Sequence, residues 1–340
     1  MISKSELIKV SGPYGLYAFA RHLTRDCPRI LMYHRFSETV SPGKVCKETF
    51  ERQIVYMKKK LNVVPLSAIC EAKEQSKPYK KNSIVLTIDD GYEDFYNIAY
   101  PILKKHNVPA TLFVTTQFVE GDFWLWPDKI TWLLDQSPAI TSPIKLGSKS
   151  VPKGIINDSN KAETWGLLTG YLLTLSDNEK LYWIDNFSKK LNCELPVKPP
   201  SSYRAVNWPQ LKEMQENGIE IGGHTVTHPS LGRVERNQLQ IEIEACKNKL
   251  DQELGSLKRD FCYPNGQPQD YTEEAKKVTQ SSGFRSSVVA FYDKNSLNDP
   301  FELRRHTVGE EDFQFFKSVN GVETLASRLL GDHNRLEWIY

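Results

Sequence analysis

Short apolar runs alternate along the chain with longer segments that have helical spacing. Segments such as PILKKHN, WPQLKEMQENG and RNQLQIEIEACKNKLDQEL lie between most of the apolar runs. This order of strand, helix and strand predicts a parallel sheet flanked by helices, which is the α/β class. The apolar runs that we expect to form strands span residues 29–34, 83–88, 110–116, 218–224, 259–264 and 284–290.

Turn residues mark two of the joints between helix and strand. In PILKKHNVPATLFV, Pro101 suits the first helical turn, where its missing N–H is no loss, and NVP ends the helix before the next strand. In ENGIEIGG, Gly218 closes a helix and a strand follows. Both joints indicate βαβ units.

One interval breaks this rhythm. It opens with FVEGDFWLWPDKITWLL, continues through the polar SPAITSPIKLGSKSVPKG and the helical KAETWGLLTGYLLTLSDNEKLYWIDNFSKKL, and leaves through PVKPPSS. We therefore expect a mainly helical insertion within an α/β domain. The expected division of the chain is an N-terminal segment at 1–28, the α/β domain at 29–116 and 203–320, the insertion at 117–202, and a C-terminal helix at 321–340.

The balance of charges argues against a nucleic-acid partner. The 340 residues include 44 Lys and Arg against 42 Asp and Glu, so no global field would recruit a polyanion. The six cysteines show no CxxC spacing, which favours reduced thiols and a cytoplasmic protein.

The N-terminus gives a second indication of the cellular location. It lacks the apolar core and cleavage site of a signal peptide, and no later stretch approaches the ~18 apolar residues of a transmembrane segment. We expect Leu7 to Leu23 to form an amphipathic helix that docks on the protein body, with peripheral contact at the inner membrane face as the alternative.

Polar residues follow three of the apolar runs. VLTI ends in Asp89 and Asp90, IEIGG ends in His224 with His228 four residues later, and DFCYP ends in the turn PNG. The carboxyl ends of parallel strands form the functional edge of such folds. Each motif also has a plain interpretation, as a capped strand-to-helix turn, a pair of surface histidines or a good turn sequence.

The spacing of His224 and His228 adds a geometric argument. Residues four apart share a side in a helix and also in an extended strand, so both rings can reach one ion. Two imidazoles and a carboxylate make a three-ligand site with an open position, which is typical of catalytic zinc.

The motifs LTIDDGYEDF, GIEIGGHTVTHPSL and FCYPNG, in this order, resemble those of the polysaccharide deacetylase family, also called the NodB-homology or carbohydrate esterase family 4 domain. PILKKHNVPATLFV is similar to the segment that follows the first motif in that family. The resemblance covers most of 29–116 and 203–310. It implies a distorted (β/α) barrel of about seven strands, which agrees with the alternation described above.

The resemblance also implies a division of work between the two aspartates. Asp90, His224 and His228 would bind a divalent metal, usually Zn²⁺ and otherwise Co²⁺, Ni²⁺ or Mn²⁺, while Asp89 would be the general base that deprotonates the attacking water. A bound dication would let both neighbouring carboxylates stay ionised. The backbone N–H of Asn265 would stabilise the oxyanion.

Two positions depart from the family pattern. The arginine that usually tethers the base is replaced by Cys262, and Arg305 in FELRRHTV could supply that guanidinium instead. His306 is the nearest match for the proton donor, although a residue next to Arg305 on a strand would point the opposite way. His34, at the end of ILMYH, is a second candidate, and a core or rim histidine is the alternative for each.

Aromatic residues near the motifs are candidates for contact with a sugar. Tyr263 lies in the third motif, and Trp124, Trp126 and Trp208 offer flat rings that match pyranose faces. Core packing is the competing interpretation of each ring.

The resulting hypothesis is a metal-dependent hydrolase that removes N-acetyl groups from amino sugars in a poly- or oligosaccharide. Relatives that act on O-acetyl esters or on non-sugar amides leave the substrate open. Two further alternatives are an inactive carbohydrate-binding relative and a metal-independent glycoside hydrolase that uses the DDGYED carboxylates.

Overall fold

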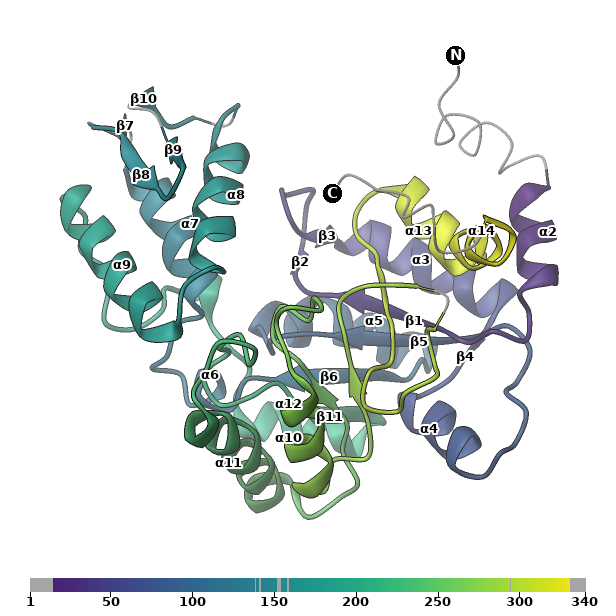
Figure 1. Cartoon of the computed structure of the whole chain (residues 1–340). Helices are drawn as coiled ribbons and strands as arrows, with labels where there is room; N and C mark the ends of the chain where they lie inside the picture. Colours follow the sequence, from purple (N-terminus) through teal and green to yellow (C-terminus); the bar gives the residue numbers. More distant parts are fainter. Residues whose placement is uncertain are drawn as a thin grey trace.

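A curled parallel sheet forms the centre of the protein (Figure 1). The structure is a computed structural model that describes residues 15–330 except 138, 141, 152, 153, 158 and 294. The order of strands confirms the predicted α/β class. Along the sheet the strands are β13 (Ser287–Val288), β12 (Phe261–Cys262), β11 (Ile219–Gly223), β6 (Ala110–Val114), β5 (Ser83–Ile88), β1 (Arg29–Tyr33) and β14 (His306–Thr307), with β4 (Asn62–Val63) paired beside the start of β5.

One short segment contacts both edges of this sheet. Leu303 pairs with Val288 of β13, and His306 pairs with Leu31 of β1, both in parallel register. Because Leu303 contacts one edge strand, β13, and His306 three residues later belongs to the other edge strand, β14, the sheet must curl. The prediction of a distorted barrel of about seven strands is therefore confirmed.

Alternate residues of the strands face two different apolar layers. Leu86 and Leu112 face outward and belong to the large cluster between the sheet and its surrounding helices, whereas Val85 and Phe113 face inward. This follows from the two-residue period of a strand. The helices around the sheet are α3 (Lys47–Lys60), α5 (Tyr100–His106), α10 (Trp208–Glu216), α11 (Arg236–Leu254), α12 (Glu273–Ser281) and α13 (Asp312–Val319), and the π-helix η2 (Phe95–Ala99) leads into α5.

The insertion has an apolar cluster of its own and appears as the teal group beside the sheet in Figure 1. Its helices agree with the expectation of a mainly helical segment. Its short antiparallel strand pairs were not predicted, because strands of two or three residues are too short to show a period. The elements are α7 (Trp126–Gln136), α8 (Lys161–Leu172) and α9 (Asp177–Lys190), with β7 (Ala139–Ile140) paired to β10 (Gly154–Ile155) and β8 (Ile144–Leu146) to β9 (Lys149–Val151).

The first and last described helices lie side by side (Figure 1). Arg328 of α14 (Val322–Leu330) donates to the carbonyl oxygen of Leu23 in α2 (Leu16–Leu23) over 3.4 Å. The expected helices at both ends extend to residues 7–14 and 331–340, which lie outside the described part. None of the described helices is long and apolar enough to cross a bilayer. The remaining short elements are β2 (Phe36–Ser37), β3 (Val45–Cys46), α6 (Thr116–Val119) and the 3₁₀ helix η3 (Ser201–Tyr203).

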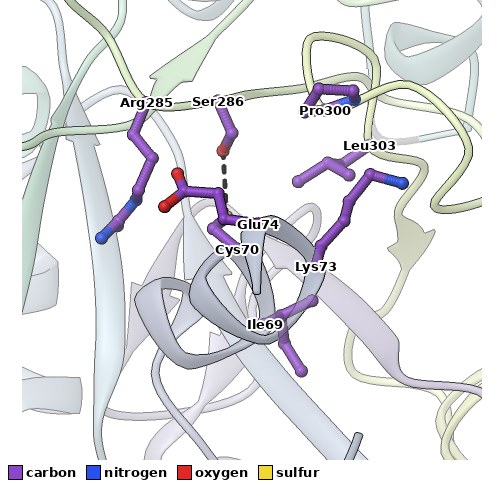
Figure 2. Close-up of a pocket in the computed structure, with 8 residues that line it drawn as sticks. All are labelled: Ile69, Cys70, Lys73, Glu74, Arg285, Ser286, Pro300 and Leu303. Carbon is purple, nitrogen blue, oxygen red and sulfur yellow. Dashed lines mark hydrogen bonds between the residues drawn. The ribbon is translucent and has the colours of Figure 1, made fainter. Parts of the chain in front are cut away.

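A cavity of about 220 Å³ lies where the strands begin, between α4 (Leu66–Glu74) and the residues before β13 (Figure 2). Figure 2 shows Cys70 bonded to Ser286, and the Sγ and Oγ atoms are 3.3 Å apart. Burial raises the pKa of Cys70 to about 12, so the thiol stays protonated. The candidate catalytic residues instead lie after the carboxyl ends of the strands, on the side of the sheet opposite to this cavity.

Candidate metal and catalytic site

Asp89 lies inside the barrel because it continues the inward-facing positions of β5. Val85 and Thr87 precede it on the same side of the strand, and Asp89 is 3% exposed. Arg305 binds both of its carboxylate oxygens, with Nη1 at 2.7 Å from Oδ1 and Nη2 at 2.6 Å from Oδ2. Arg305 thus lies where the sequence analysis expected a guanidinium beside Asp89.

The remaining donors of Arg305 are also satisfied. Nε donates to the carbonyl oxygen of Val289 over 2.9 Å, and Nη1 donates to Thr87 Oγ1 over 2.9 Å. Nη2 lies 3.2 Å from Cys262 Sγ. The small thiol side chain thus leaves room for the guanidinium of Arg305, which directly precedes β14.

Arg305 determines the charge of Asp89. Burial by itself raises the pKa of Asp89, but the charge and hydrogen bonds of Arg305 outweigh it, and the pKa of Asp89 lies below its usual value. The carboxylate is therefore ionised at neutral pH and ready to accept a proton.

Asp90, His224 and His228 converge as predicted. The Nε2 atoms of both histidines lie 3.4 Å from Asp90 Oδ1. Ligand atoms about 2.0–2.1 Å from a tetrahedral zinc ion are roughly 3.3 Å apart, so these three groups fit such an ion. The donor set of two imidazoles and one carboxylate also matches catalytic zinc sites.

The hydrogen bonds of His224 orient it for metal binding. Its Nδ1 donates to the carbonyl oxygen of Cys262 over 2.7 Å, which leaves the lone pair of Nε2 directed at the Asp90 side. His228 is 7% exposed, and its Nδ1 has no partner among the described residues. Such an orientation suits a cation between the rings and the carboxylate.

The backbone around the site adopts conformations that side chains seldom allow. Asp90 has φ 77°, Thr225 has φ 66°, His228 has φ 62° and Asn265 has φ 60°. Left-handed conformations at residues other than glycine cost about 1–3 kcal/mol each and are concentrated at functional sites. Gly91 also has a positive φ, of 92°. A larger residue would not fit at this position, because its Cβ would lie 2.9 Å from Val114 Cγ1.

A second set of possible ligands shares His224. Asp89, His224 and Cys262 also offer atoms within 4.8 Å of one another. Arg305 already binds Asp89 and contacts Cys262, so its charge would repel a cation there. The set that contains Asp90 is the better metal site.

The two histidines considered as proton donors have different surroundings. His34 Nε2 lies 3.8 Å from Asp89 Oδ2, and its side chain is 44% exposed. His306 Nδ1 instead lies 2.5 Å from Glu323 Oε2, and its ring stacks on Tyr292 at a centroid distance of 3.8 Å. The structure thus brings His34 to the site and turns His306 away, as the alternation around Arg305 indicated.

Asn265 lies in the third motif, in a tight turn that Gly266 closes. No acceptor for its backbone N–H is found in the described part of the chain, and its Nδ2 is likewise buried without a partner there. A free N–H at this turn is what an oxyanion would need.

Three of the four aromatic residues predicted to bind sugar are buried in this structure. Tyr263 is 1% exposed and stacks on Tyr271 at 4.7 Å. Trp124 is 3% exposed and stacks on Tyr203 at 5.7 Å, and Trp126 is 5% exposed. Trp208 is only partly buried and donates to an exposed carboxylate, that of Glu120, over 3.0 Å.

A cluster beside the candidate metal ligands was missed by the sequence analysis. It joins Arg35, which follows His34, to Tyr92, which follows Asp90 by two residues, and to Asp128 of the insertion. The only sequence signal for Asp128 was its place in the first turn of a predicted helix. Acidic residues are common there because they interact favourably with the helix dipole.

The comparisons with known proteins agree with this arrangement. YxkH of Bacillus subtilis (strain 168), named as a polysaccharide deacetylase, is 23% identical over 262 residues, which are 76% of this chain and 63% of that protein. The poly-beta-1,6-N-acetyl-D-glucosamine N-deacetylase of Staphylococcus aureus (strain MSSA476) is 34% identical over 84 residues, 24% of this chain and 29% of that protein. The chain therefore spans less than two thirds of these relatives.

A solved structure shows the same fold. The deacetylase PplD of Streptococcus pyogenes, in complex with acetate, has a TM-score of 0.56 at 20% identity, over 87% of this chain and 96% of that one. The family model described as polysaccharide deacetylase matches residues 76–142 and 181–287. These residues are just over half of the chain, which belongs to the polysaccharide deacetylase family.

Proposed function

We propose that this chain is a metal-dependent deacetylase that hydrolyses N-acetyl groups of amino sugars in a poly- or oligosaccharide. The observation that carries the proposal is the position of an arginine-tethered carboxylate, Asp89, directly beside the Asp90, His224 and His228 cluster. A general base next to a three-ligand cation site is the arrangement found in metal-dependent hydrolases that activate water.

Asp90, His224 and His228 would hold the metal. When bound there, a divalent ion such as Zn²⁺ lowers the pKa of a water molecule towards ~7 and polarises a carbonyl oxygen. Asp89 accepts the proton of the attacking water, and Arg305 keeps both oxygens of that carboxylate in place. The N–H of Asn265 donates to the oxyanion that forms when water adds to the acetamido carbonyl.

His34 donates the proton that the leaving amine requires. Its ring reaches the Asp89 side of the site and stays accessible, whereas His306 is engaged by Glu323. An amine is a poor leaving group until it is protonated, so a donor near the scissile bond is needed. This replaces His306 by His34 in the proposed mechanism.

The substrate class is inferred from the relatives. The Staphylococcus aureus proteins are named for the N-deacetylation of poly-beta-1,6-N-acetyl-D-glucosamine, and 84 residues of this chain align with them. An N-acetylated saccharide is therefore the first substrate to test, with O-acetyl esters and non-sugar amides as the alternatives on the same scaffold.

The deciding experiment measures acetate released from β-1,6- and β-1,4-linked N-acetylglucosamine oligomers. The purified chain is assayed as prepared, after chelation, and after readdition of zinc. We expect chelation to abolish release and zinc to restore it. Asp89→Asn should lower kcat by roughly 10²–10⁴-fold without loss of metal, and His224→Ala should lose both metal and activity.

Matched controls are His22→Ala and Asp185→Asn, which change side chains far from the barrel interior. Release that persists in a chelator would contradict metal dependence and favour the glycoside hydrolase alternative if glycosidic bonds are cut. Saccharide binding with no acetate from N-acetyl, O-acetyl or non-sugar amide substrates would favour the inactive relative.

A further inference from the structure

The insertion brings a buried carboxyl group to the edge of the candidate site. Asp128 lies in the first turn of α7 and is 7% exposed. Its Oδ2 accepts a hydrogen bond from the hydroxyl of Tyr92 over 2.8 Å, and Tyr92 follows the proposed metal ligand Asp90 by two residues. Asp128 therefore belongs to the surroundings of the catalytic residues although it is part of the insertion.

Arg35 flanks this carboxyl group without bonding to it. The guanidinium lies 3.7 Å from the centre of the Tyr92 ring, and it donates to Asp94 Oδ2 over 2.6 Å and to the carbonyl oxygen of Ser202 over 2.7 Å. Its Nη1 is 3.8 Å from Asp128 Oδ1, which is beyond hydrogen-bonding distance. Arg35 thus has better partners than Asp128.

Oδ1 of Asp128 is consequently left with unused acceptor capacity. A carboxylate can accept about four hydrogen bonds, and in the described part of the chain the Tyr92 hydroxyl is the donor that Asp128 has. The side chain of Asp128 is 9% exposed, so part of it can be reached from solvent.

Burial is the main cause of a raised pKa at Asp128. It raises the pKa of Asp128 to about 7, and the charge of Asp90 adds to the rise, although the Arg35 charge and the Tyr92 hydrogen bond oppose it. A donor supplied by a ligand would stabilise the charged form and lower this pKa again. The charged form of Asp128 would therefore be more stable in a complex with a hydrogen-bond donor than in the free protein.

We propose that Asp128 is a specificity-determining residue, whose Oδ1 accepts a hydrogen bond from a hydroxyl group of the sugar that presents its acetamido group to Asp89. The inference rests on the proposed function. An amino sugar carries hydroxyl groups on ring carbons near the one that bears the acetamido group, and Asp128 is linked to the metal-ligand turn by Tyr92 and flanked by the residue after His34. The insertion would thereby select for the saccharide.

The test removes the hydroxyl groups of the substrate one at a time. Wild type is assayed for acetate release on an N-acetylglucosamine oligomer and on analogues that are 3-deoxy, 4-deoxy or 6-deoxy at the acetylated residue. We expect kcat/KM to fall roughly 10- to 100-fold for one analogue, since a hydrogen bond to a charged group is lost. If no analogue loses more than about 5-fold, the inference is overturned by wild type alone.

The variant Asp128→Asn then identifies the partner of that hydroxyl. It should raise KM for the parent substrate, change kcat less, and show little further loss on the sensitive analogue. Tyr92→Phe keeps Oδ1 and should retain the sensitivity. If Asp128→Asn lowers kcat/KM by the same factor for the parent substrate and for every analogue, Asp128 merely anchors the insertion. Asp185→Asn, at an exposed carboxylate of α9, is the control.

These outcomes separate the inference from the proposed function. A wild-type chain that releases no acetate from the parent substrate contradicts the proposed function and with it this role of Asp128. A wild-type chain that is active but indifferent to every hydroxyl contradicts only the role of Asp128.

Discussion

Arg305 and Asp89 form a buried two-point ion pair across the barrel, although 216 positions separate them in the sequence. Each nitrogen at the end of the guanidinium binds one oxygen of the carboxylate, and both side chains are at most 4% exposed. The position and ionisation of the proposed base therefore depend on a residue next to the last strand of the barrel.

Replacing Arg305 by lysine should separate charge from geometry. A single ammonium group cannot bind both oxygens, so Asp89 would keep its charge and lose its fixed orientation. We expect kcat/KM for acetate release to fall on the order of 10²-fold, while metal content stays at the wild-type level. Steady-state kinetics and metal analysis check the two parts.

A second substitution at this position tests stability. Arg305→Met leaves the buried carboxylate unpaired and should lower the free energy of unfolding by about 3–5 kcal/mol, measured by urea denaturation. Arg304→Lys is the matched control, because Arg304 is the neighbouring arginine and pairs with Asp293, away from Asp89. An Arg305→Lys variant with wild-type kcat/KM would show that the two-point contact is not needed.

The second prediction concerns which groups hold the metal. Cys262→Ala should retain one bound zinc ion per chain after dialysis, and Asp90→Ala should lose it, because Arg305 disfavours a cation at the Asp89, His224 and Cys262 set. Zinc at 100 times its dissociation constant should stabilise Cys262→Ala by about 2.7 kcal/mol and leave Asp90→Ala unaffected. Metal analysis and thermal unfolding with and without zinc provide the measurement.

The opposite result has a clear meaning. Loss of zinc from Cys262→Ala with retention in Asp90→Ala would place the ion between Asp89 and the thiol. Cys246→Ala is a control for removal of a buried thiol outside both ligand sets.

The fold and the main site could be predicted because they depend on local patterns. In a parallel sheet the residues after each strand meet at one edge, so Asp89, Asp90 and His224 had to lie close together once their strands were recognised. The two-residue alternation likewise separated Arg305 from His306. These arguments need no knowledge of how distant segments pack.

The parts that could not be predicted depend on tertiary packing. Trp124 is stacked on Tyr203, and Tyr263 on Tyr271, because the insertion and the third motif bury these rings, and a sequence does not tell which side of a ring will be covered. Asp128 reaches Tyr92 only after the insertion has folded against the barrel. The left-handed backbone at His228 had no signal, since no glycine stands there.

The third prediction concerns stability in acid. The pKa of Glu323 is lowered to about 2: burial opposes the shift, but His306 and Lys317 outweigh it. A carboxyl group whose pKa is lower in the folded state stabilises the protein above its unfolded pKa, near 4.5, and this contribution is lost as the pH falls towards 2. The contribution is at most roughly 3 kcal/mol.

The variant Glu323→Gln should therefore unfold more easily than wild type at pH 7, and the difference should shrink as the pH falls from about 4.5 towards 2. Urea denaturation at several pH values gives the comparison. Glu311→Gln, at an exposed carboxylate of the same region, is the control. A difference that stays constant from pH 7 to pH 2 would show that the charge of Glu323 does not contribute.

The fourth prediction distinguishes the two histidines by the leaving group of the substrate. Hydrolysis of an N-acetyl amide needs a proton on the departing amine, whereas 4-nitrophenolate leaves an acetate ester without one. If His34 donates the proton, His34→Ala should lower kcat/KM for the amide by roughly 10²–10⁴-fold and for 4-nitrophenyl acetate far less. His306→Gln should change both substrates by the same factor, because its ring is bonded to Glu323 and stacked on Tyr292 rather than directed at the site. The assignment of His34 fails if its replacement slows the ester as much as the amide, since the ring would then act on a step that both reactions share.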